Sequence, residues 1–184
     1  MRQAAALISA GLASVPVSPA SGQDSASVHV ATAMAVLVDS ITLVESQAPC
    51  CAGWAVTLRR VGPWTAWVFA ANGQVTEAIL GQDGAAFDQV VARMFRDGLT
   101  DLEKPGAGWT DVPWAHVAMH SGRACYSASI ADLDPWPSSW LRVLRIGASV
   151  RDSLLARRSP RRRPEPPSGR GIVELGSTCL PGLR

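Results

Sequence analysis

The dipeptide Asn72-Gly73, which lies between two β-prone segments, limits the fold of this chain more than any other feature. A type I′ turn needs positive φ at both of its central residues, and Asn-Gly is a strongly preferred pair for it. Aromatic and β-branched residues are frequent in segment 64–70 before the turn and in segment 75–80 after it. The pattern therefore predicts an antiparallel β-hairpin.

Two earlier segments are also predicted to contain strands. Trp54, Val56 and Leu58 alternate with smaller or more polar residues, which is the period of a half-buried strand. Segment 28–44 is apolar and β-branched, and we expect at least one strand there, most readily over residues 41–45.

A second hairpin is predicted near the middle of the chain. Segments 116–119 and 124–130 have strand character, and the dipeptide Ser121-Gly122 lies between them as a turn. Two hairpins and two single strands are enough for an antiparallel sheet of ordinary size.

Two helices are predicted, one after each hairpin. The first follows Asp83, a suitable N-cap, and ends at Gly98. Its apolar residues recur on one helical face: Phe87, Val90, Val91, Met94 and Phe95. The second is expected to begin with Ser138 as its cap and to run to about residue 155. Its apolar residues are expected to face inward: Trp140, Val143, Leu144, Ile146, Val150 and Leu154. This order predicts an α+β fold, an antiparallel sheet with two helices on one face.

The chain of 184 residues is expected to form one domain with a tail at each end. We assign the domain to residues 28–156. Residues 157–184 are rich in arginine and proline and are predicted to be a disordered basic tail. Residues 1–23 are predicted to be a signal peptide or a disordered leader, because a basic start precedes an apolar stretch and small residues.

The leader predicts export to the periplasm or the extracellular space. No apolar run is long enough to span a membrane. In an oxidising compartment the four cysteines are expected to form disulfides, and we predict that Cys125 bonds to Cys50 or Cys51. Cys179 would then stay free or pair between chains.

Sequence motifs for catalysis are scarce. The chain contains neither a GxSxG motif nor a glycine-rich phosphate-binding loop, so we predict a protein that is not an enzyme and needs no cofactor. One alternative is a metal site or a metal-dependent enzyme built from His116, His120 and Cys125, whose nitrogen and sulfur atoms suit zinc. Otherwise both histidines are expected on the solvent-exposed face of a strand.

The tryptophans and the arginines are the candidate residues for contacts with a partner. Trp109 and Trp114 lie in or beside a loop and are predicted to contact a protein partner, since exposed aromatic residues often anchor interfaces. The arginines of the tail could neutralise the phosphates of nucleic acid or of anionic lipid, but short tails of arginine and proline usually remain solvated, so neither is predicted as a partner.

Three short stretches resemble known domains: residues 41–46, Pro49-Cys50-Cys51-Ala52-Gly53-Trp54 and residues 110–113. Their layout from residue 41 to about residue 155 resembles small exported bacterial domains of unassigned role, and is similar to emfourin-type inhibitors of secreted metalloproteases. The resemblance implies an α+β fold and a protease as one possible partner. It assigns no functional residue, since this chain lacks the Cys-x-x-x-Cys-Pro spacing of the first group.

The sequence therefore favours a small, exported, non-enzymatic domain that binds another protein, in the manner of a protease inhibitor. Two alternatives remain open. One is the metal-binding protein or metal-dependent enzyme described above, and the other is an open reading frame without a defined function.

Overall fold

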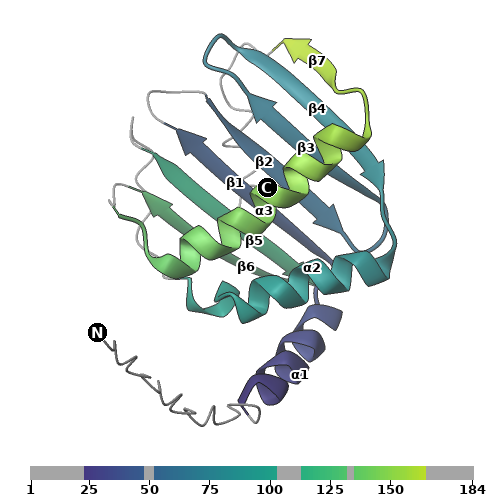
Figure 1. Cartoon of the computed structure of the whole chain (residues 1–184), viewed down its shortest axis with the longest axis vertical. Coiled ribbons are helices and arrows are strands. Elements are labelled where there is room, and N and C mark those ends of the chain that lie inside the picture. The colour runs from purple at the N-terminus through teal and green to yellow at the C-terminus, as the bar shows by residue number, and fades with distance from the viewer. Residues whose placement is uncertain (1–22, 48–51, 103–112, 132–134, 165–184) are drawn as a thin grey trace, which may run out of the picture.

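The computed structural model describes residues 23–47, 52–102, 113–131 and 135–164. Seven strands form one sheet in the order β6-β5-β1-β2-β3-β4-β7, and every neighbouring pair is antiparallel (Figure 1). The elements are α1 (Gln23–Val36), β1 (Ser40–Gln47), β2 (Ala52–Arg59), β3 (Pro63–Phe69), β4 (Gln74–Gly81), α2 (Gly84–Arg96), the 3-10 turn η1 (Leu99–Asp101), β5 (Trp114–Ser121), β6 (Ala124–Ala131), α3 (Ser138–Arg157) and β7 (Arg161–Pro164). The predicted α+β class is confirmed.

Both predicted hairpins are present. Gly73 has a φ of 77° in the turn between β3 and β4, and the side chain of Asn72 accepts a hydrogen bond from the backbone of Gln74. Gly122 has a φ of 57° in the turn between β5 and β6. These two glycines adopt the left-handed backbone that such turns require.

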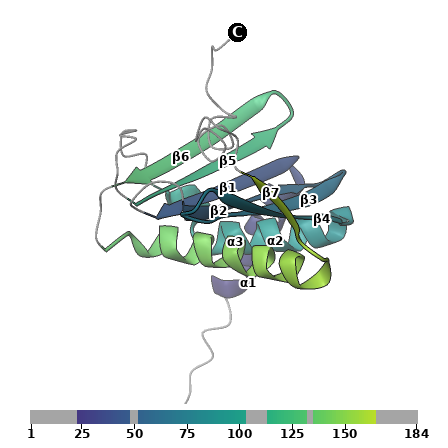
Figure 2. The ribbon, with the colours of Figure 1, turned by 90° about the horizontal axis from the view of Figure 1, so that it is seen from above.

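Helices α2 and α3 cover one face of the sheet, and α1 packs against α2 (Figure 2). The main core lies between the sheet and the helices. It includes fully buried side chains of β1 and β2 and large side chains from the helices, among them Ile41, Leu43, Val56, Leu58, Phe87, Met94 and Trp140. Helix α3 approaches the sheet closely at Gly147, where a Cβ would lie 3.0 Å from the indole of Trp54.

Arg60, in the turn after β2, connects α1 and α2 to the sheet through its side chain. Its guanidinium donates hydrogen bonds to the backbone oxygens of Ala35 and Val38, and it forms an ion pair of 2.6 Å with Asp88 of α2. It also lies over the ring of Phe87, 5.2 Å from the ring centre. The same side chain therefore fixes the N-terminal half of α2 beside the sheet.

The strand predicted over residues 41–45 is confirmed as β1. Residues 28–36 form part of a third helix, α1, which was not predicted; alanine is frequent there and favours a helix. The predicted start of α3 is wrong. Pro137, not Ser138, is the N-cap of α3, and Ser138 begins the helix itself. Proline suits this place because it lacks a backbone N–H.

The predicted boundary of the domain at residue 156 is also too early. Residues Arg161–Pro164 form β7, which pairs with β4 at the edge of the sheet. A short edge strand forms backbone hydrogen bonds and needs no apolar side chains, so charge and proline content did not reveal it. Gln23, the last residue of the predicted leader, begins α1, so the predicted start of the domain at residue 28 is too late. Residues 1–22 of that leader and residues 165–184 of the predicted tail lie outside the described residues.

Candidate functional site

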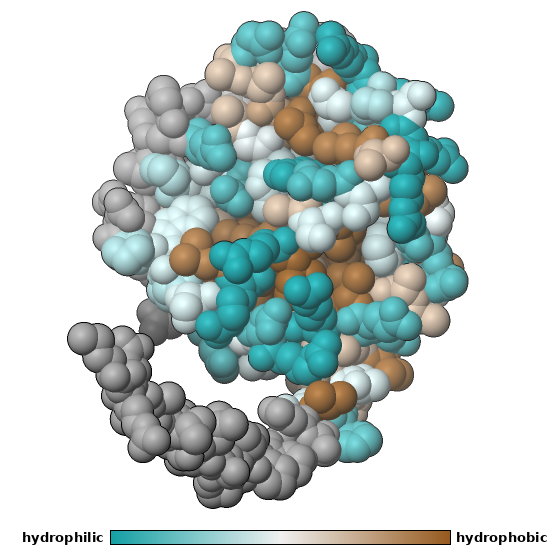
Figure 3. Space-filling model, in the orientation of Figure 1, coloured by the Kyte–Doolittle hydropathy of each residue, from teal (hydrophilic) through white to brown (hydrophobic). Residues whose placement is uncertain are grey.

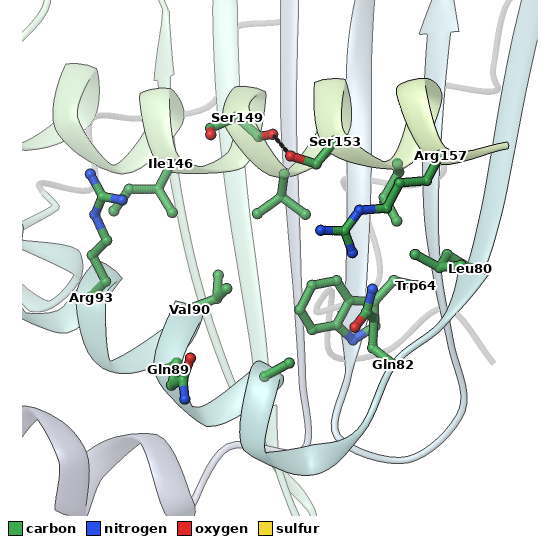
Figure 4. Close-up of a pocket in the computed structure, with 13 residues that line it drawn as sticks. Trp64, Leu80, Gln82, Gln89, Val90, Arg93, Ile146, Ser149, Ser153 and Arg157 are labelled. Atoms are coloured by element: carbon green, nitrogen blue, oxygen red, sulfur yellow. Dashed lines mark hydrogen bonds between the residues drawn. The ribbon is translucent and has the colours of Figure 1, made fainter.

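A cavity of about 390 Å³ opens between α2 and α3 over strands β3 and β4 (Figure 4). The two helices meet where the C-terminal end of α2 approaches the start of α3, and there Arg142 donates a hydrogen bond to the backbone oxygen of Asp97. They diverge toward the other end of α3 (Figure 1). We call the cavity in this opening the α2–α3 pocket.

The floor of the α2–α3 pocket is apolar. Ile146, Val150 and Leu154 follow one another at intervals of four along α3, so they share a face of that helix. Trp64 of β3 and Leu80 of β4 lie below them. Figure 3 shows apolar surface on this face of the molecule between hydrophilic side chains.

Trp64 is held in place by its only polar atom. Its indole N–H donates a hydrogen bond of 3.0 Å to the backbone oxygen of Arg59, and the residue is buried. Buried tryptophans normally use this N–H in such a way. The ring therefore offers the pocket an apolar surface with no unsatisfied polar group.

The rim of the α2–α3 pocket is polar. It carries two amides, two hydroxyls and two guanidinium groups: Gln82, Gln89, Ser149, Ser153, Arg93 and Arg157. In Figure 4 the side chains of Arg157 and Gln82 lie beside the indole of Trp64. The lining includes no histidine, cysteine, aspartate or glutamate, so its residues supply binding groups and none of the usual proton carriers.

His116 and His120, singled out by the sequence, lie on the face of the sheet opposite the helices. His116 is only 6% exposed, so its predicted exposure is wrong. Its Nδ1 forms a hydrogen bond of 2.7 Å with the hydroxyl of Ser129, while its Nε2 has no partner among the described residues. Burial lowers the pKa of His116 from 6.5 to about 4, so the ring is neutral at pH 7.

His120 and Cys125 are opposite each other on β5 and β6. The Sγ of Cys125 lies 3.6 Å from Nε2 of His120, but Cys125 is disulfide-bonded and therefore carries no thiolate. Among the described residues, no three histidine, cysteine or acidic side chains are grouped to hold a metal ion. Cys50, Cys51 and Cys179 lie outside that part of the chain, so the predicted pairing of Cys125 stays a prediction.

The two tryptophans predicted to contact a partner are not an exposed pair. Trp114 is 8% exposed and packs with Val44, Phe69 and Val75 on the face without helices. The expectation that it is an exposed anchor is wrong, because it begins a strand of the sheet and not a loop. Trp109 lies outside the described residues.

The α2–α3 pocket was not foreseen from the sequence. Its apolar residues on α3 belong to the stripe expected to face the core, and that stripe is the signal that was present. The gap depends on the angle between two helices that are distant in sequence. Helical periodicity carries no information about such an angle.

Comparison with known proteins found no matching protein family, no matching curated sequence and no matching solved structure. The resemblance to emfourin-type inhibitors, the predicted export and the predicted protein partner therefore stay predictions. None of the helices that the structure describes is both long and apolar enough to cross a membrane.

Proposed function

We propose that the chain is a non-enzymatic binding domain and that its binding site is the α2–α3 pocket. One observation carries the proposal: a cavity of about 390 Å³ with an apolar floor and a polar rim. Sites for small ligands are typically concave, mostly apolar and about 300–1,000 Å³ in volume, with a few polar groups that orient the ligand. The pocket fits this description in volume and in combining an apolar floor with polar groups, although its share of polar residues is higher.

The position of the pocket also supports the proposal. It is formed by regular elements of the sheet and of two helices, and the main core lies beneath it. A site on packed elements holds its shape better than a site on loops. The helices are fixed at one end by Arg142 and along α2 by Arg60, so the opening between them is built into the fold.

Filling the pocket is expected to abolish binding of an apolar ligand. Val150→Trp places an indole in the cavity, and N-phenyl-1-naphthylamine, a neutral dye that fluoresces in apolar surroundings, serves as the probe. We expect its affinity to fall by about tenfold or more, because each apolar group excluded from the pocket loses its transfer free energy. Fluorescence titration measures the affinity, and circular dichroism checks that the variant is folded.

Leu141→Trp is the matched control for this experiment. Leu141 lies on the same helix, is 46% exposed and does not line the pocket. The control is expected to bind the dye as the unchanged chain does. If both variants bind the dye with unchanged affinity, the dye occupies another surface and the pocket is not the binding site.

A further inference from the structure

The charges on the two helices that form the α2–α3 pocket are unbalanced. Together α2 and α3 carry six arginines and two aspartates. Both aspartates are already paired: Asp88 binds Arg60, and Asp152 binds Arg151 at 2.7 Å. No acidic residue of either helix therefore neutralises the arginines that line the pocket.

The two arginines of the rim differ in how far they are neutralised. Arg93 approaches Asp97 at 3.9 Å, a loose pair in which the arginine is largely exposed. Arg157 has no ion-pair partner within the part of the chain that the structure describes. It is therefore the group best able to receive an anion.

The neighbours of Arg157 define where an anion would lie. The guanidinium is beside Trp64, and the amide of Gln82 lies near the same ring (Figure 4). A guanidinium donates two parallel hydrogen bonds to a carboxylate, and an amide N–H adds a third donor. The apolar floor begins at this point and continues along Val150 and Ile146.

We propose that the ligand of the α2–α3 pocket is a small amphiphilic monocarboxylate, with its carboxylate at Arg157 and Gln82 and its apolar body on Trp64, Val150 and Ile146. This inference rests on the proposed function and names the class of ligand for the same site. One unpaired guanidinium beside an apolar floor matches one negative charge on an apolar body. A ligand without charge would form no ion pair with Arg157, whereas a dianion would exceed the charge that this arginine supplies.

The test compares ligands that differ only in the head group, with octanoate, 1-octanol and octyl phosphate displacing the neutral dye. We expect octanoate to bind about fivefold more tightly than 1-octanol, since an ion pair with an exposed arginine is favourable but partly screened by water. Arg157→Gln is expected to remove this difference by weakening octanoate and leaving 1-octanol unchanged. Arg145→Gln is the control, because Arg145 lies on α3, is exposed and does not line the pocket.

The outcomes separate this inference from the function on which it rests. Equal binding of octanoate and 1-octanol, with no effect of Arg157→Gln, would overturn the inference about the ligand. The proposed function would still stand in that case if Val150→Trp weakened binding of the dye. Tighter binding of octyl phosphate than of octanoate would overturn the assignment to a monocarboxylate. If neither octanoate nor the dye responds to Val150→Trp, the proposed function fails as well.

Discussion

Replacing Trp140 by alanine is expected to lower the free energy of unfolding by about 3–5 kcal/mol, as is usual when a large core aromatic residue is removed. Trp140 is the largest fully buried side chain, with an exposed fraction of 0%, and it packs α3 against the sheet. A domain of this size is typically stable by only about 5–15 kcal/mol. Urea unfolding followed by circular dichroism measures the change.

Two further variants show whether the loss comes from packing. Leu141→Ala removes an exposed neighbour on the same helix and is expected to change stability by about 1 kcal/mol or less. Trp140→Phe keeps much of the volume and removes a buried indole N–H that has no partner within the described part of the chain, so it is expected to cost less than alanine. Equal effects of Trp140→Ala and Leu141→Ala would show that α3 does not pack as described.

The stability of the chain is expected to depend on pH through His116. Burial lowers the pKa of this residue to about 4 in the folded chain, against 6.5 in the unfolded chain. Between these values the unfolded state binds more protons than the folded state. Stability is therefore full above about pH 6.5 and falls as the pH drops toward 4, by up to about 3 kcal/mol from this one residue.

His116→Asn is the variant that tests this dependence. An asparagine keeps a polar group near the hydroxyl of Ser129 but does not titrate in this range. We expect the difference in unfolding free energy between pH 6.5 and pH 4.5 to be smaller in the variant by roughly 2–3 kcal/mol. The same pH dependence in both proteins would mean that His116 is not buried as a neutral ring.

Local patterns were sufficient to predict most of the central elements. Asn72-Gly73 and Ser121-Gly122 defined their hairpins because the turn chemistry is set by adjacent residues. Asp83 caps α2, as expected, and accepts a hydrogen bond of 2.8 Å from the backbone of Ala86. The apolar stripe that follows it faces the core, with Phe87 and Met94 fully buried.

Features that depend on distant parts of the chain were not predictable in this way. Helix α1 lacks a one-sided apolar stripe, so its pattern did not separate a helix from a strand. β1 is a central strand with Thr42, Val44 and Ser46 buried on the face without helices, and its neighbour His116 is buried with them. Which side chains meet on that face depends on the order of the strands, which single segments do not encode.

The candidate site shows the same division between local and distant information. Val90, Ile146, Val150 and Leu154 were expected to point inward, and they do line the interior side of their helices. The charge imbalance around Arg157 becomes visible only when Asp88 and Asp152 are seen to bind other arginines. The pocket thus arises from an angle between helices and from ion pairing, neither of which has a sequence motif.

The most direct test of the α2–α3 pocket is a nuclear magnetic resonance titration of the isotope-labelled chain with octanoate. Binding in the pocket predicts that the backbone amide signals of Gln89, Val90, Ser149 and Ser153 move together and saturate at one ligand per chain. Signals of Thr42, Thr57 and Ala118, which lie on the opposite face of the sheet, are expected to stay in place. Shifts confined to that opposite face, or no shifts at saturating octanoate, would contradict the account.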